Sequence, residues 1–108
     1  MDKKISKKVS AVVRDYVKVL KKDIPVERVV LYGSHAKGES GNSSDIDVAV
    51  ISSVFGRNPH EEGKYLFRKL WDVKSANIDP IGYSPKSFLN NNSPLVAEIK
   101  KYGVEIDL

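Results

Sequence analysis

Two short apolar segments, joined by a stretch rich in glycine and serine, constrain the fold of this chain more than any other feature. The first segment, residues 26–32, ends directly before Gly33, and the second, residues 45–51, carries Asp45 and Asp47 two positions apart. Residues i and i+2 of a strand point to the same face, so a strand over 45–51 places both carboxylates on one face. The opposite face is then apolar and consists of Ile46, Val48 and Val50.

Carboxylates that lie close to an apolar core are costly unless a compensating group is present, and a divalent metal ion is the usual one. A third aspartate, Asp79, lies in another apolar segment, residues 77–83, and Pro80 within that segment indicates an edge strand because proline cannot donate to a ladder. If this third strand lies beside the second, the three carboxylates converge. Such a site suits two Mg²⁺ ions and an in-line displacement at phosphorus. The alternative for Asp79 is a cap of the turn before the proline.

The turn after the first strand is a candidate phosphate site. Gly33 lets the backbone approach a ligand, and the amides that follow can point at a phosphate. Ser34 offers a hydroxyl and Lys37 a positive charge. A Gly-Ser pair alone is equally compatible with a plain tight turn, but its combination with Asp-x-Asp is much more specific.

The remaining segments predict a single domain over residues 1–108, of mixed α/β (α+β) class. Apolar residues at helical spacing predict helices over 3–22 and 60–74, and Trp71 in the second is expected to pack against the core. Pro85 and Pro94 are expected in the first turns of helical segments. Residues 104–108 are expected to form a terminal strand or tail.

Composition limits the classes of function. The chain has no cysteine, which excludes disulfides and thiolate metal sites and suits the cytoplasm, where we expect the protein to act. It has no apolar run long enough for a membrane span, so no membrane is expected as a partner. Eight basic residues fall within residues 3–22. Because no aromatic residues interleave with them on the basic face (Tyr16 belongs to the apolar face), a solvated helix face is favoured and nucleic acid is not the expected partner.

Two strings of residues carry a family resemblance: Gly33-Ser34-His35-Ala36-Lys37-Gly38 and Ser44-Asp45-Ile46-Asp47. Together they resemble the signature of the minimal nucleotidyltransferase domains of the DNA polymerase beta superfamily. The resemblance covers nearly the whole chain, because a helix precedes the strings and a third aspartate follows on a later strand. The family often has arginine where this chain has histidine at 35 and lysine at 37, and this departure concerns phosphate affinity rather than metal binding.

The resemblance implies a small mixed sheet flanked by helices, ATP as substrate with two Mg²⁺ ions, and release of pyrophosphate. By motif position, Gly33 and Ser34 hold the triphosphate with help from Lys37. The expected catalytic and metal-binding residues are Asp45, Asp47 and Asp79. Some family members of this length resemble antitoxins that are paired with HEPN-domain toxins.

The resemblance therefore makes adenylylation of a HEPN-type partner protein the first expectation, in a homo- or hetero-oligomer. A non-catalytic module that neutralises a partner by occupancy is one alternative. A transferase that acts on a small molecule is another, and a basic nucleic-acid binder is the least favoured.

Overall fold

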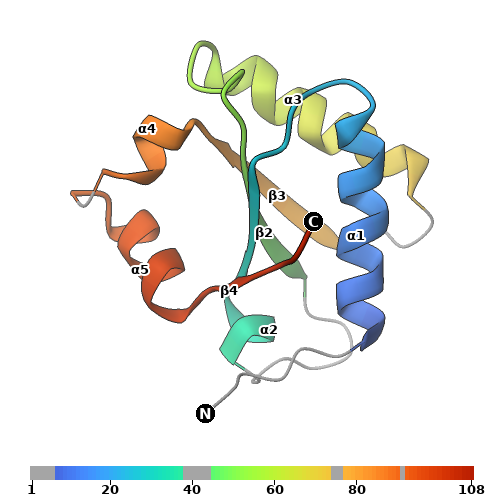
Figure 1. Cartoon of the computed structure of the whole chain (residues 1–108), viewed down its shortest axis with the longest axis horizontal. Coiled ribbons are helices and arrows are strands. Elements are labelled where there is room, and N and C mark those ends of the chain that lie inside the picture. Colours follow the sequence, from blue (N-terminus) through green and yellow to red (C-terminus); the bar gives the residue numbers. More distant parts are fainter. Residues whose placement is uncertain (1–6, 38–44, 74–76, 91) are drawn as a thin grey trace.

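The structure is a computed structural model that describes residues 7–37, 45–73, 77–90 and 92–108. It contains a four-stranded sheet with helices on both faces (Figure 1). In chain order the elements are α1 (Lys7–Lys21), β1 (Arg28–Tyr32), α2 (Ser34–Lys37), β2 (Ile46–Ile51), α3 (Pro59–Lys69), the 3₁₀ turn η1 (Leu70–Asp72), β3 (Ile78–Tyr83), α4 (Pro85–Phe88), α5 (Pro94–Tyr102) and β4 (Val104–Glu105). The predicted mixed sheet with flanking helices is confirmed.

The sheet has the strand order β3-β2-β1-β4. β1 pairs antiparallel with both β2 and β4, whereas β2 and β3 are parallel. A parallel pair needs a crossover connection, and α3 provides it between the end of β2 and the start of β3. This crossover places the third predicted strand directly beside the second.

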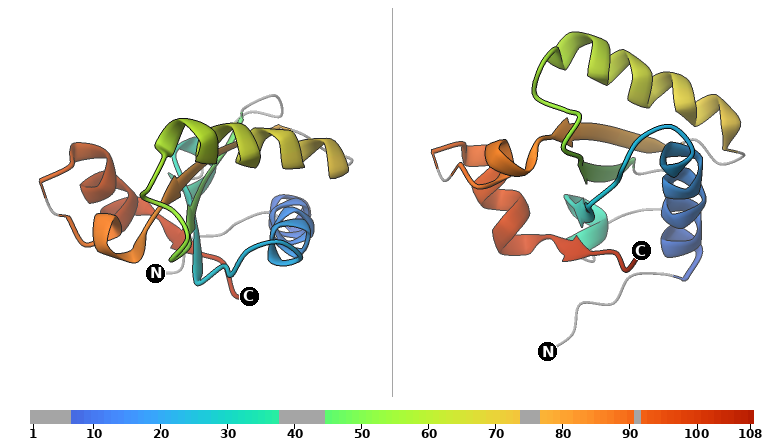
Figure 2. Two further views of the ribbon diagram at one scale, coloured as in Figure 1. Left: turned by 90° about the horizontal axis from the view of Figure 1, so that it is seen from above. Right: turned by 45° about the horizontal axis from the view of Figure 1, so that its top comes forward.

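The larger core lies between the sheet and the two long helices α1 and α3. Val29 and Leu31 of β1 and Val48 of β2 point to this face and are fully buried. The Tyr16 hydroxyl of α1 donates a buried hydrogen bond of 2.6 Å to the Leu66 carbonyl of α3, which ties the two helices together. Figure 2 shows both helices on the same side of the sheet.

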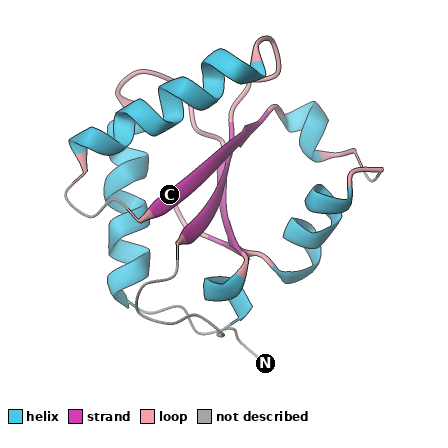
Figure 3. Cartoon of the chain, turned by 180° about the vertical axis from the view of Figure 1, so that it is seen from behind, coloured by secondary structure: helices cyan, strands magenta, loops and turns pink. Residues whose placement is uncertain are grey.

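The opposite face of the sheet packs against α4 and α5, as the view from behind also shows (Figure 3). Its smaller core consists of Val30, Ala49, Ile51, Phe88, Val96 and Ile99. Because strand side chains alternate between faces, Tyr32 and Asp47 belong to this second face. The second face is therefore apolar toward one end of β2 and acidic toward the other.

Three helices begin with the same pair of residues, a capping side chain followed by proline. Asn58, Ser84 and Ser93 cap α3, α4 and α5 respectively, and each accepts a hydrogen bond from a backbone N–H of the first turn. Proline suits the first helical position because its missing N–H would have no intrahelical partner. The predicted first-turn positions of Pro85 and Pro94 are confirmed.

Pro80 lies in the edge strand that the sequence predicts. The carbonyls of Asn77 and Tyr83 accept hydrogen bonds from Ile46 and Ser52 on the β2 side, at 2.6 and 3.0 Å. By alternation along the strand, Pro80 directs its backbone away from β2, where no ladder donor is required.

The prediction that Trp71 packs against the core is wrong. Helix α3 ends at Lys69 and continues as the 3₁₀ turn η1, and the Trp71 side chain is 90% exposed. Leu66 and Leu70, four positions apart, form the buried side of this segment, while Phe67 precedes Trp71 by four positions on the outer side and is 49% exposed. Along the described ranges, no helix combines the length and apolar character that a bilayer span requires.

Candidate active site

Three polar side chains form a row across three adjacent strands at one end of the second face. Asp47 of β2 is in register with Tyr32 of β1 on one side and with Asp79 of β3 on the other. Side chains in register on neighbouring strands share a face, and the strands lie about 4.8 Å apart. Two of the three predicted carboxylates are therefore direct cross-strand neighbours.

Gly33 lies against the central carboxylate of this row. Its φ of +74° is in the left-handed region that favours glycine, and a Cβ at this position would overlap the Oδ2 atom of Asp47. The turn after β1 and the acidic residue of β2 are thus in direct contact. The two halves of the predicted motif, the Gly-Ser turn and the Asp-x-Asp segment, meet at this point.

The third predicted carboxylate, Asp45, immediately precedes β2 rather than lying within it, and its side chain is exposed. Asp79 is also exposed, whereas Asp47 is half-buried. Within the described part of the chain, no three His, Cys, Asp or Glu side chains come together as a group that could hold a metal ion. Asp47 and Asp79 therefore form the structured centre of the site, with Asp45 at its margin.

The electrostatics of the row favour a cation. Burial raises the pKa of the Asp47 carboxyl above its usual range, and the nearby carboxylates of Asp79 and Asp45 raise it further, while His35 opposes them. Burial also raises the pKa of the Tyr32 phenol, and the carboxylates of Asp47 and Asp79 raise it further. Two like charges held side by side are stabilised by a proton or by a positive ion between them.

The donor set suits Mg²⁺ in particular. Carboxylate oxygens are the ligands that this ion prefers, and it is usually bound through one or two carboxylates together with substrate phosphates rather than by a complete protein cage. Asp47 and Asp79, with open solvent at Asp79, match that requirement.

The predicted phosphate residues lie at the start of the short element α2. Ser34 is its first residue, directly after Gly33, and is half-buried. Lys37 ends the element, but its side chain lies outside what the structure describes, as do residues 38–44. Ala36 anchors α2 by packing into the larger core.

Sequence reasoning missed two residues that face this site. The carboxylate of Glu98, on α5, is close enough to raise the pKa values of both Asp47 and Tyr32. No motif or spacing indicates Glu98, because it is one exposed residue of an amphipathic helix. Tyr32 could have been identified from its position just before Gly33, but only if the register with Asp47 were known.

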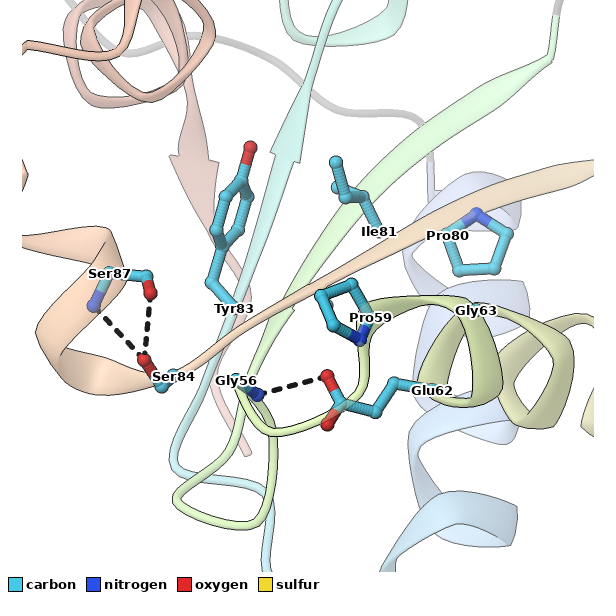
Figure 4. Close-up of a pocket in the computed structure, with 10 residues that line it drawn as sticks. Gly56, Pro59, Glu62, Gly63, Pro80, Ile81, Tyr83, Ser84 and Ser87 are labelled. Carbon is cyan, nitrogen blue, oxygen red and sulfur yellow. Dashed lines mark hydrogen bonds between the residues drawn. The ribbon is translucent and has the colours of Figure 1, made fainter.

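A cavity of about 460 Å³ lies at the other end of β3 and contains none of the predicted site residues (Figure 4). Three polar side chains on its wall are already paired. The Glu62 carboxylate accepts N–H bonds from Gly56, Arg57 and Asn58, and the Ser84 and Ser87 hydroxyls are 2.9 Å apart in a hydrogen bond. We assign no chemistry to this cavity.

Comparison with known families gives a match to the nucleotidyltransferase domain over residues 13–106. A protein of Methanocaldococcus jannaschii, named provisionally as a protein adenylyltransferase, is 26% identical over 99 residues, which cover 85% of this chain and 96% of the relative.

Two solved complexes contain chains of the same fold. One is a toxin–antitoxin with AMP-PNP, at a TM-score of 0.64 and 22% identity, covering 87% of this chain and 71% of that one. The other is a tri-AMPylated HEPN toxin of Shewanella oneidensis in complex with its MNT antitoxin, at a TM-score of 0.53 and 19% identity, covering 92% and 71%.

Proposed function

This chain belongs to the nucleotidyltransferase domain family, and from that premise we propose that it transfers AMP from ATP to a hydroxyl group on a partner protein. The observation that carries the proposal is the cross-strand pair of Asp47 and Asp79, in which Asp47 contacts the Gly33 turn. Metal-binding oxygens and a backbone that can approach a phosphate are the two components that this reaction needs at one place.

In the proposed reaction, the acceptor oxygen attacks the α-phosphorus of ATP. The new bond joins that oxygen to phosphorus, the bond from the α-phosphorus to the oxygen that bridges to the β-phosphate breaks, and pyrophosphate leaves. Asp79, at the exposed edge of the row, takes the proton of the acceptor hydroxyl. The backbone after Gly33 and the Ser34 hydroxyl orient the triphosphate, with Lys37 contributing positive charge.

Asp45, Asp47 and Asp79 would hold two Mg²⁺ ions. When bound, these ions supply the positive charge that stabilises the attacking and leaving oxygens. The half-buried Asp47 lies two positions after Asp45 and in register with Asp79, and it would be one of the ligands of these ions. Its raised pKa in their absence is the expected sign of a site built for cations.

The solved complexes support a partner of the HEPN toxin class, because one of them contains a HEPN toxin that carries AMP together with an antitoxin of this fold. The name of the archaeal relative supports a protein acceptor. We accordingly propose that this chain is the antitoxin of a toxin–antitoxin pair, that it acts in the cytoplasm and that it assembles with its partner.

The test is transfer of label from ATP to the product of a neighbouring HEPN-type gene, or to a HEPN protein of the same genome. We expect transfer from ATP labelled at the α-phosphate, none from ATP labelled at the γ-phosphate, and no transfer by Asp79→Asn. Asp72→Asn, in the exposed turn η1, is the matched control and should retain activity. Transfer of the γ-phosphate, or full activity of Asp79→Asn, would contradict the proposal.

A binding module that neutralises its partner by occupancy is the second candidate. The exposed Phe67 and Trp71 side chains favour it, because aromatic residues of this kind often anchor protein interfaces. The double variant Asp45→Ala, Asp47→Ala separates the two candidates. Partner neutralisation that survives in this variant supports occupancy, and its loss in a folded variant supports catalysis.

A further inference from the structure

The outer surface of α1 carries a straight row of positive charge, formed by Lys7, Arg14, Lys18 and Lys21. At 100° per residue these four positions fall within an arc of about 60°, and the row runs about 21 Å along the helix. The one acidic residue of α1, Asp15, lies outside this arc. We call these four residues the basic row.

The carboxyl half of the basic row forms one wall of a groove of about 400 Å³. Arg14, Lys18 and Lys21 line it, with Val17 and Leu108 as apolar surface and Asp107 as its one acidic residue. Figures 1 and 2 show α1 on the outside of the fold, with the end of the chain beside it. The helix packs on the sheet face opposite to the one that carries Asp47, so the groove is separate from the candidate active site.

The positive charges of the basic row outnumber the one acidic residue of the groove. Other basic residues form ion pairs, such as Arg28 with Glu105 at 2.8 Å and Lys69 with Asp23 at 2.7 Å, but none of the row's four side chains forms one with a described residue. Like charges three and four positions apart on a helix repel. Favourable interaction with the helix dipole explains why lysine occurs in the last turn of α1, but it does not explain the positive charge of Lys7 or Arg14.

We infer that the basic row binds the phosphate backbone of a single-stranded nucleic acid. A linear polyanion can contact all four cations, whereas a compact free triphosphate reaches only part of a row this long. A protein partner is less well matched, because lysine is depleted at protein interfaces and the row has no aromatic anchor. The apolar part of the groove suits an unstacked base or a sugar, which a single strand can offer.

This inference reverses the expectation from sequence, which set nucleic acid aside for lack of interleaved aromatic residues. Aromatic side chains provide base stacking, but phosphate contacts need only ordered cations. The structure adds the alignment of the cations and the groove beside them. The binding should therefore be independent of base sequence and sensitive to salt.

The experiment is fluorescence anisotropy of a labelled 12-nucleotide RNA titrated with the full chain at 50 and 200 mM NaCl. Four phosphate contacts predict that affinity falls about 50-fold between these concentrations, from a slope of about −0.7 per contact. The variant Arg14→Gln, Lys18→Gln, Lys21→Gln should bind at least tenfold more weakly at 50 mM, and its salt effect should fall to about threefold. Glutamine has a helix propensity close to those of lysine and arginine, so α1 should persist.

The matched control is Arg57→Gln, Lys64→Gln, Lys86→Gln, which removes three exposed positive charges elsewhere. It should change affinity less than threefold. Equal losses in the two triple variants, or no binding by the wild-type chain at 50 mM, would overturn the inference. Inorganic tripolyphosphate and polyglutamate serve as competitors. Each competitor is compared with unlabelled RNA at an equal concentration of charge. If either one displaces the labelled RNA as effectively as unlabelled RNA does, the inference is also overturned.

Discussion

The two faces of the sheet differ in the charge that their side chains carry. The face under α1 and α3 is apolar throughout, and residues such as Leu31 and Val48 are fully buried. The other face is apolar beneath α4 and α5 but ends in Asp47 and Asp79, two like charges in register. The first face holds the fold together, while the second gives up stability at the candidate active site. This is the usual relation between a core and a functional site.

The largest effect on stability should come from the apolar face. Leu31→Ala removes a fully buried side chain from the larger core and should lower the free energy of unfolding by about 3 kcal/mol. Leu95→Ala, at a position 39% exposed, is the control and should cost less than about 1 kcal/mol. Urea unfolding measures both. Equal costs would show that the burial of Leu31 does not determine the cost of truncating it.

Gly33→Ala should have the next largest effect, because it strains a positive φ and places a methyl group against the Asp47 carboxylate. We expect a loss of about 2 kcal/mol, of which about half should disappear when Asp47→Gly is added. Gly63→Ala is the matched control, since its added Cβ meets nothing within 4 Å, and it should be neutral or stabilising. Additive effects of the Gly33 and Asp47 changes would contradict the contact between them.

The acidic end of the second face should gain stability when one of its charges is removed. Asp47→Asn should raise the free energy of unfolding at pH 7 by up to about 1 kcal/mol, the range for like charges directly opposite in a sheet. Because the pKa of Asp47 is raised in the folded state, the wild-type chain loses stability as pH rises through that pKa. The advantage of the variant should therefore be absent near pH 4 and grow toward neutral pH. If the difference in the free energy of unfolding between the variant and the wild type does not change with pH, charge repulsion at Asp47 is excluded as its cause.

The smallest effect is expected at Trp71. Its side chain is 90% exposed, so Trp71→Ala should change the free energy of unfolding by less than about 0.5 kcal/mol. Leu66→Ala, on the buried side of α3, should cost about 3 kcal/mol. A loss above about 2 kcal/mol for Trp71→Ala would restore the packing role that the helical spacing suggested.

Local features of this fold could be predicted from the sequence because each depends on nearby residues. The apolar alternation of β2, the edge position that Pro80 requires and the prolines after capping serines all follow from backbone chemistry within a few residues. The position of Gly33 at a left-handed turn is of the same kind.

Features that depend on the packing of distant segments could not be predicted in this way. The register of Asp47 with Asp79 depends on how α3 crosses the sheet, and the approach of Glu98 depends on how α5 docks. The exposure of Trp71 depends on where α3 ends and on which side Leu66 and Leu70 are buried. The motif predicts the residues of the candidate site, but the structure was needed to show that Asp47 and Asp79 are paired and that Asp45 lies just outside β2.

The central claim is that the pair of carboxylates exists to bind a metal–nucleotide complex. The most direct measurement is the melting temperature with and without Mg²⁺ and a non-hydrolysable ATP analogue, for the wild-type chain and for the double variant Asp47→Asn, Asp79→Asn. Without ligand, we predict that the variant melts at a higher temperature than the wild type. With the complex of Mg²⁺ and the ATP analogue at 100 times its Kd, we predict that only the wild type is stabilised, by about 2.7 kcal/mol, which raises its melting temperature by several degrees. An equal rise in both chains would contradict the claim.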